Sequence, residues 1–592
     1  MSGYRGMRRR LVIQTLVFVV SSLQLCADDT VPDVSPVSLI GESAAICLEV
    51  PNVEKTWSDF LKSPLASRLK KFPPAERLLS GPGFAKWTAL QEYSRRVTGK
   101  TLSEQLIEAF AESIVVAIYL PEGKTPQGIL IGKSRTEESL KQALQSWMTL
   151  DPNHVVQNRE HHGQSYVRRA KSTSSSDVVY YATFGRTFVL SDHESLVQEA
   201  IDKRALAIRK VTASPVPTST VRTLGDLELF RTNRERLPKD ASAFLFVNVR
   251  AWERALENEI QKSPDAVFIR QALRSVSGLG LSLHLGNEAV FNLVTDVNSD
   301  ARSTSWKHFV SGTKRDGEWA RRIPSESVLS ISGHLAMRPL IEAWLTIFAP
   351  SKSPDFVRTR SALNSALLGQ DFFLDVLPGL LHDWTVTVCS VDDASKSLLP
   401  IEIQGQFAVP GESSSDHKLS DSLDNALHFA MNLAALHYSV QAADPEKPLV
   451  SRTAPTSAGL VRSLVGFKGW SPSYLLGVEQ LVVASNSATL SPAQNATQTP
   501  NARFVSLERR HFSNATQLIW LDALRLRNLI NRHGAWLSAM LTPDSAGDRE
   551  RVRTHLNGIH EVIKLFDTAF VAARFEEDHA HVVFGVSLDR ND

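Results

Sequence analysis

Three histidine-containing stretches hold the residues best able to do chemistry. Ser191-Asp192-His193 places all three residue types of a hydrolase triad side by side. Triad members converge from different segments and must face one another, so this adjacency argues against catalysis. Ser191 follows an apolar run and precedes Glu194 by three residues, which is typical of a helix-capping box. We therefore predict that a helix starts here, and the sequence leaves the catalytic residues, if there are any, unknown.

The segment EEDHAH, residues 576–581, is the candidate metal site. Glu576, His579 and His581 offer carboxylate and imidazole ligands, and the two histidines would share one face of a strand. A charged hairpin turn explains the same residues, and the matching turn at Gly286-Asn287-Glu288 has no histidine. We therefore expect no bound metal, with Glu576, His579 and His581 as the candidates if one binds.

A third histidine cluster, His154, His161 and His162, precedes an expected strand. It permits a metal or acid–base role, but a solvated loop explains it as well. The sequence has no G-x-S-x-G, H-E-x-x-H, Walker A or C-x-x-C motif. We therefore expect no cofactor.

Length and charge restrict the class of protein. A chain of 592 residues is too long for one core, and about 150 residues per domain gives roughly two to four domains. Its 65 basic and 63 acidic residues leave a net charge of +2. Such a balance gives no general attraction to anionic lipid or to phosphate backbones, so we expect no nucleic-acid partner unless a local patch exists.

The N-terminus has the layout of a secretory signal peptide, residues 1–27. Basic residues from Arg5 to Arg10 precede an apolar run, Leu11 to Val20, and Ala27 lies at the expected cleavage site. The run is interrupted by polar residues, which disfavours a spanning helix. We expect a secreted or periplasmic protein with no membrane span after cleavage; the alternative is an uncleaved N-terminal anchor.

Two cysteines remain after that cleavage. Cys47 and Cys389 both lie in apolar, strand-like runs. Export permits a disulfide between them, and two buried thiols are the alternative.

One block of sequence recurs four times and organises the rest of the chain. The copies begin at Ser43, Ala241, Ser327 and Ala515, and each indicates a strand followed by a helix. In the first copy, Ser63-Pro64 ends one helix and begins the next, because serine suits the N-cap and proline the first helical position. The helix before it carries an apolar stripe, including Trp57 and Leu61, that we expect to face a core.

The copies alternate between long and short units, which indicates a tandem duplication giving two lobes. Hairpin signals after each block favour antiparallel sheets with helices packed on one face, an α+β fold. The predicted boundaries are lobe A at 37–300 (long unit 37–205, short unit 238–300), a linker at 301–321, and lobe B at 322–590 (long unit 322–490, short unit 510–590).

Several apolar runs resemble those of a bacterial domain-of-unknown-function family of exported proteins. The runs are SIVVAIYL, GILIGKSRTEESLKQAL and YYATFGRTFVLSDHESLVQEAI, with a weaker echo in EQLVVASNSATL. The resemblance implies export and a repeated architecture. Because that family has no established activity, it implies no site residues.

These observations lead to one functional expectation and one alternative. We expect an exported, non-catalytic binding or scaffolding protein of the cell envelope, acting on an unknown envelope or extracellular partner. The alternative is an exported hydrolase with a site assembled from distant residues. In either case function should lie in what the repeats do not share, above all residues 84–111 and 371–383.

Overall fold

The architecture is that of a computed structural model, which divides into two compact units, Met1–Asn298 (unit 1) and Ser299–Asp592 (unit 2). The predicted signal peptide, 1–27, lies outside the described residues, as does the predicted linker 301–321 apart from residue 310. The described residues are 33–588 without 123–124, 151–153, 173–177, 213–221, 262–269, 271–272, 299–309, 311–322, 335–336, 339–340, 343–344, 346–353, 368, 392–399, 410–416, 442–448, 457–458, 467–469, 478–479, 491–500 and 542–545.

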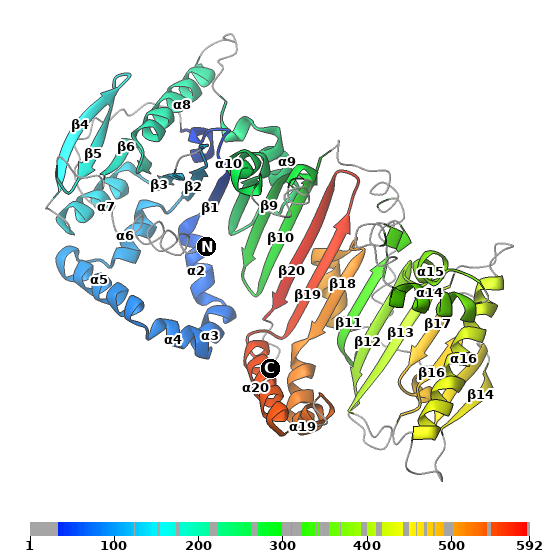
Figure 1. Cartoon of the computed structure of the whole chain (residues 1–592). Coiled ribbons are helices and arrows are strands. Elements are labelled where there is room, and N and C mark those ends of the chain that lie inside the picture. Colours follow the sequence, from blue (N-terminus) through cyan, green and yellow to red (C-terminus); the bar gives the residue numbers. More distant parts are fainter. Residues whose placement is uncertain are drawn as a thin grey trace. The chain divides into compact units, whose positions relative to one another are not determined.

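Unit 1 is built on one antiparallel sheet (Figure 1). Its strands lie in the order β4-β5-β6-β7-β3-β2-β1-β8-β9-β10. They are β1 (Ile46–Pro51), β2 (Ser113–Tyr119), β3 (Gln127–Lys133), β4 (Val155–His161), β5 (Gln164–Ala170), β6 (Val178–Phe184), β7 (Thr187–Ser191), β8 (Ala243–Asn248), β9 (Val276–Leu285) and β10 (Glu288–Val297). The first two repeat blocks supply β1 and β8, which pair with each other between β2 and β9.

Helices cover both faces of this sheet. They are η1 (Pro36–Leu39), α2 (Val53–Lys62), α3 (Pro64–Lys70), α4 (Pro73–Leu79), α5 (Pro82–Thr98), α6 (Leu102–Ala109), α7 (Glu137–Leu150), α8 (Glu194–Thr212), η2 (Leu224–Asp226), α9 (Glu228–Arg236) and α10 (Val249–Gln261). One face, here the α8 face, packs on α8, α9 and η1 through Val115, Ala117, Ile131, Leu196 and Phe230. The opposite face packs on α6 and α7 through Leu130, Phe188, Phe110, Leu140 and Trp147.

The mixed α+β class with antiparallel strands is confirmed, but the prediction that helices pack on one face is wrong for unit 1. All five residues of β7 are buried. Successive side chains of a strand point to opposite faces, so such a strand needs cover on both sides. The run TFVLS in the sequence is therefore typical of a strand that lies between two layers of helices.

Unit 2 repeats the strand order of unit 1. Its sheet is β14-β15-β16-β17-β13-β12-β11-β18-β19-β20, again antiparallel throughout. The strands are β11 (Ser327–His334), β12 (Asp383–Ser390), β13 (Ile401–Ala408), β14 (Val450–Thr456), β15 (Gly459–Val465), β16 (Ser473–Leu476), β17 (Gln480–Ala484), β18 (Gln517–Asp522), β19 (Thr568–Phe575) and β20 (His579–Ser587). The third and fourth repeat blocks supply β11 and β18.

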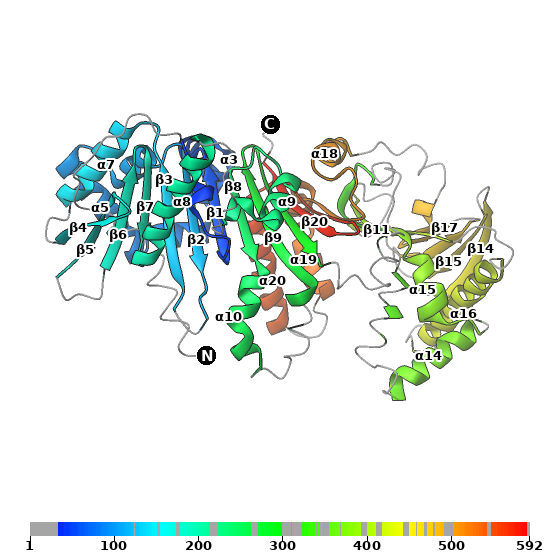
Figure 2. The ribbon, with the colours of Figure 1, turned by 90° about the horizontal axis from the view of Figure 1, so that it is seen from above.

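The helices of unit 2 differ more from those of unit 1 than its strands do. They are α14 (Pro354–Ala366), η6 (Phe372–Val376), α15 (Leu377–Leu380), α16 (His417–Gln441), η7 (Ser487–Leu490), α18 (Ala502–Leu507), η8 (Glu508–Phe512), α19 (Ala523–Leu541) and α20 (Ala546–Ile563). α16 lies along β14 and β15 (Figure 2). Where β7 leads into the 19 residues of α8, β17 leads into the four residues of η7.

A row of side chains across the sheet also differs between the units. In unit 1 it faces α8 and is apolar: Phe246, Cys47, Ala117 and Ile129. The same places in unit 2 hold Trp520, Ser330, Thr387 and Gln404. All of them are buried. Ser330 Oγ donates to Thr387 Oγ1 at 3.4 Å, so hydroxyl contacts replace apolar packing here.

Candidate functional site

The Ser191-Asp192-His193 stretch forms a turn, not a catalytic triad. Ser191 Oγ donates to the Gly128 carbonyl at 2.7 Å and accepts from the His193 amide at 3.0 Å. The His193 ring contacts Asp192. α8 does start here, at Glu194, but the predicted capping box is not formed. The Glu194 carboxylate instead accepts from Tyr166 and Arg159, each at 2.5 Å.

The turn between β19 and β20 gathers part of the predicted metal cluster. Donor atoms of Glu576, Asp578 and His579 lie within 4.8 Å of one another, whereas His581 is not part of the group. His579 Nδ1 lies 2.8 Å from an Asp578 oxygen, and Glu576 pairs with Arg574 at 2.8 Å. A guanidinium at this carboxylate competes with a cation, and hydrogen bonds within the turn account for the arrangement. A metal here stays a low-ranked prediction.

The third histidine cluster lies mostly at the tip of a hairpin. His162 and Gly163 both adopt positive φ, as the two-residue turn between β4 and β5 requires. The turn brings His161 to 2.9 Å from Asp202 and His162 to 3.8 Å, while His154 is not part of this group. The pair with Asp202 links the hairpin to α8, which is a structural role.

Both cysteines are free thiols. Burial raises the pKa of Cys47 and of Cys389 to about 12. At neutral pH both are therefore protonated. The prediction of a buried thiol is confirmed for Cys47, whereas Cys389 is only partly buried.

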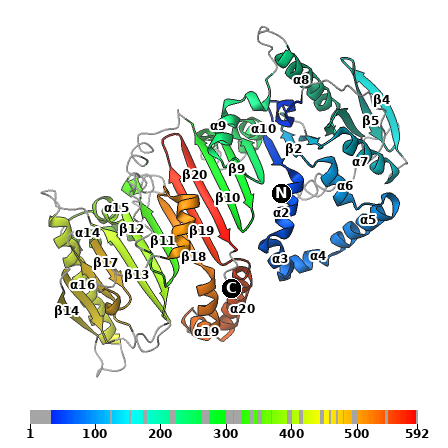
Figure 3. The same ribbon diagram turned by 180° about the vertical axis from the view of Figure 1, so that it is seen from behind.

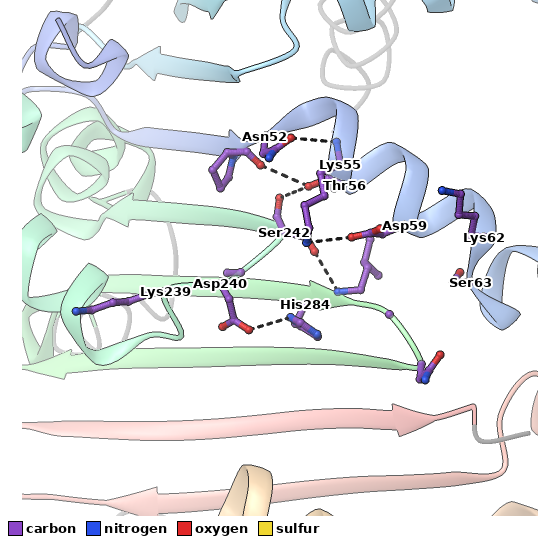
Figure 4. A pocket seen from close by; sticks show the side chains of 15 residues that line it. Asn52, Lys55, Thr56, Asp59, Lys62, Ser63, Lys239, Asp240, Ser242 and His284 are labelled. Carbon is purple, nitrogen blue, oxygen red and sulfur yellow. Dashed lines mark hydrogen bonds and ion pairs between the residues drawn. The ribbon is translucent and has the colours of Figure 1, made fainter. Parts of the chain in front are cut away.

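A groove of about 550 Å³ lies in unit 1 between α2 and the ends of β8 and β9 (Figure 4). α2 begins at the groove because Asn52, in a left-handed conformation, accepts a hydrogen bond from the Lys55 amide. Thr56 Oγ1 reaches the Ser242 carbonyl at 3.5 Å and holds α2 against β8. The groove is lined by the charged side chains of Lys55, Asp59, Lys62, Lys239 and Asp240 and by the imidazole of His284.

The groove holds the residue types of a hydrolase, but not their arrangement. Ser242 Oγ accepts from the Leu285 amide at 3.1 Å, and His284 lies 3.8 Å from Asp240. No hydrogen bond joins Ser242 to His284 among the described residues. Ser63 Oγ donates to the Phe60 carbonyl and caps α3. The groove is thus a mixed-charge surface that can contact a polar ligand.

Beyond the groove, α2 to α5 form a string of helices along one side of unit 1, here the helical arm (Figure 3). α3, α4 and α5 each begin with a proline, which directs the chain from one short helix into the next. α3 and α4 make their main contacts with the neighbouring helices of the arm. The Ser63-Pro64 cap predicted from the sequence is confirmed.

The arm exposes apolar side chains that the sequence analysis placed in a core. α2 and α4 bury no residue; Trp57 is 44% exposed and Leu78 76%. Among the described residues, the arm holds seven of the nine large apolar side chains that unit 1 exposes: Trp57, Leu61, Leu78, Leu79, Phe84, Tyr93 and Val97. The prediction that the α2 stripe faces a core is wrong, because periodicity shows that a face is apolar but not what covers it.

The arm is also basic. Val53–Thr98 contains nine lysines and arginines against four acidic residues, a net charge of +5, whereas the whole chain is +2. Lys70, Lys71 and Lys86 are exposed and have no acidic partner among the described residues. The net charge of the whole chain therefore gives no indication of this local basic patch. A charge count over windows of the sequence would have found it.

Comparisons with known proteins add little to this picture. No protein-family model matches the chain, and no curated protein matches it in sequence. Among solved structures, crystal form III of TP0453 gives a TM-score of 0.24 at 13% identity, covering 46% of this chain and 84% of that one. Crystal form IV gives 0.23 at 13% identity, covering 45% and 81%. At these scores neither fold nor function can be transferred.

Proposed function

We propose that the protein is an exported, non-catalytic protein of the cell envelope that binds anionic membrane surfaces through its helical arm. The observation that carries the proposal is the coincidence, in Val53–Thr98, of exposed apolar side chains with a net charge of +5. Helices that combine these two features lie in the interface of anionic bilayers. In the part of the chain that the structure describes, no helix is long and apolar enough to cross a bilayer.

The energetics favour a membrane over a purely charged partner. Each lysine or arginine near an anionic surface contributes about 1 kcal/mol. A large apolar side chain contributes on the order of 1.5–3 kcal/mol if it is fully withdrawn from water. A nucleic acid would use the charges but leave Leu78, Leu79 and Phe84 in water. A bilayer interface uses both.

The export on which this function depends is itself part of the proposal. It is supported by the N-terminal pattern of residues 1–27 and by the resemblance to an exported family. An uncleaved N-terminus would tether the same arm to a membrane and would raise its effective concentration there.

We also propose that the two units arose by tandem duplication. The support is the shared order of ten described strands, with the strands of two repeat blocks paired at the same place in each unit. A crystal structure in which the strands of the units fail to superpose would contradict it.

Co-sedimentation with vesicles tests the membrane proposal. Wild-type protein should bind vesicles rich in phosphatidylglycerol, and more weakly as salt is raised. Replacing Lys70, Lys71 and Lys86 by glutamine should weaken binding about a hundredfold, since three charges contribute about 3 kcal/mol.

The matched control removes the same charge outside the arm. Arg231, Arg250 and Arg254 of unit 1 are exposed, and their replacement by glutamine should leave vesicle affinity within a few fold of wild type. Equal losses of vesicle affinity in both variants would show that binding depends on the total charge and not on the arm, which would contradict the proposal. Tighter binding to a DNA duplex than to vesicles would point to a nucleic acid instead, and no binding to vesicles would refute the proposal.

A further inference from the structure

Helix α16 of unit 2 exposes a narrow apolar stripe. Phe429, Leu433, Leu436 and Val440 are between 54% and 77% exposed. Their spacing of four, three and four residues puts them on one side of the helix. Apolar residues at this spacing form the seam between two paired helices. The stripe is therefore an exposed apolar helix face with the spacing that suits pairing with a second helix.

The opposite side of α16 fixes the direction in which the stripe points. Leu423 and Ala435 are buried. Asp424 accepts from Arg462 Nε at 3.0 Å and from Tyr474 OH at 2.9 Å, which ties the helix to β15 and β16. Burial alone would raise the pKa of Asp424, but these hydrogen bonds outweigh it and hold the pKa below its usual value. α16 cannot turn its stripe inward without breaking this half-buried ion pair.

Unit 1 shows what covers the helix at the same place in its fold. α7 also precedes the outer four strands, and its apolar residues Leu140, Leu144 and Trp147 are buried. They pack on Phe188 and Leu190 of β7, and α5 and α6 contact the same helix. At this place in the fold the helix of unit 1 therefore takes other helices as neighbours in addition to the sheet.

The lack of charge along most of α16 argues against the anionic membrane surface that we propose as the partner of the helical arm. No acidic residue, lysine or arginine occurs from Asn425 to Gln441. A neutral face has no attraction to anionic lipid or to a strongly charged protein. A second copy of the same neutral face meets no like-charge repulsion.

The stripe is also complementary to itself. Its spacing reads the same in both directions, so two antiparallel copies related by a two-fold axis bring Phe429 against Val440 and Leu433 against Leu436. The largest side chain then meets the smallest, which lets the layers interdigitate. We propose that α16 pairs with α16 of a second copy of this chain, in antiparallel orientation, and so forms a homodimer.

The expected dimer is weak. Four side chains on each helix bury less than the roughly 1,600 Å² of a standard interface. We therefore expect a dissociation constant on the order of micromolar. On a membrane, two linked arms would bind with higher avidity than one, but the dimer does not depend on the membrane proposal.

Sedimentation velocity of the full chain over a range of concentrations tests the dimer. Wild-type protein should pass from monomer to dimer as concentration rises. Leu433→Glu places two carboxylates near the centre of the seam and should raise the dissociation constant at least about a hundredfold. Because Leu433 is exposed, the melting temperature should not change.

Leu78→Glu in the arm is the matched control, since it adds the same charge at an exposed leucine of unit 1. It should leave the dimer intact and weaken vesicle binding. Leu433→Glu should abolish the dimer and, at concentrations where the wild type is monomeric, leave vesicle binding unchanged. Wild-type protein that stays monomeric, or a dimer that survives Leu433→Glu, would refute the proposal. So would binding of the wild type to neutral phosphatidylcholine vesicles that Leu433→Glu abolishes, because lipid would then be the occupant.

Cross-linking tests the antiparallel register separately. In the proposed pairing, position 433 faces position 436 of the other copy. A chain with Leu433→Cys should therefore cross-link to a chain with Leu436→Cys faster than either links to itself. Faster cross-linking of Leu433→Cys to itself would contradict the register.

Discussion

The two units share an order of ten described strands and differ in the helices that face solvent. Unit 1 exposes its apolar helix residues in the arm, among lysines and arginines with a net charge of +5. Among the described residues, unit 2 exposes its largest group of apolar helix residues on α16, in a stretch without acidic residues, lysine or arginine. An exposed apolar helix face alone does not specify a partner. The charges around it separate a membrane surface from a second copy of the chain.

The interiors of the two units also differ, because unit 2 buries polar side chains where unit 1 buries apolar ones. Where unit 1 buries Cys47 and Val115 on its α8 face, the same places in unit 2 hold Ser330 and Thr385. The Thr385 and Ser332 hydroxyls are buried, and no described group hydrogen-bonds to them. Unpaired buried hydroxyls cost free energy, so this part of the unit 2 core should be less stable than its counterpart in unit 1.

The largest expected effect on stability concerns pH and unit 2. Burial, helped by Arg574 and His579, lowers the pKa of His581 from 6.5 to about 4. The unfolded chain would bind this proton near pH 6.5, so the free energy of unfolding should fall as pH drops from about 6.5 to 4, by at most about 3 kcal/mol. Unit 1 has Val290 at the equivalent place in β10.

Chemical unfolding at several pH values, with hydrogen exchange to separate the units, measures this effect. His581→Val should flatten the pH dependence of unit 2 between pH 6.5 and 4 and leave unit 1 unchanged. If unit 2 kept its full pH dependence in this variant, another group would be responsible.

A smaller effect on stability is expected when Val115 of unit 1 and Thr385 of unit 2, which occupy equivalent places, are each replaced by the residue of the other unit. Val115→Thr buries a hydroxyl in the apolar core of unit 1 and should lower its free energy of unfolding by about 1–3 kcal/mol. Thr385→Val removes an unpaired hydroxyl at the equivalent place and should raise that of unit 2 by about 1 kcal/mol. Hydrogen exchange of each unit would measure both shifts. Destabilisation by both changes would mean that Thr385 makes a favourable hydrogen bond.

Local features of the fold were predictable from the sequence. The four strand-and-helix blocks, the Ser63-Pro64 cap and the turns near Gly286 and Glu576 depend on residues close together in the chain, whose preferences are local. Cover on both faces of the unit 1 sheet was missed, although the fully buried β7 carried the signal. To predict this cover, one must know which helices pack on each face of the sheet.

The candidate surfaces were predictable only in part. The α2 stripe containing Trp57 was recognised as apolar, yet its exposure depends on which elements pack against α2, and no local pattern specifies that. The α16 stripe sits on a helix with a second apolar side, so its periodicity merges with that of the buried face. The pairing of β1 with β8 joins residues about 200 apart, and no local pattern specifies it.

The most direct test of the central claim labels both surfaces with an environment-sensitive dye. Leu78→Cys and Leu436→Cys provide the sites, with Cys26 replaced by serine; Cys47 and Cys389 resist labelling because their pKa is about 12. Adding phosphatidylglycerol vesicles to dilute protein should shift the emission of the label at position 78 to the blue and leave the label at position 436 unchanged. A shift at position 436 alone, or at neither position, would contradict the assignment of the arm to the membrane.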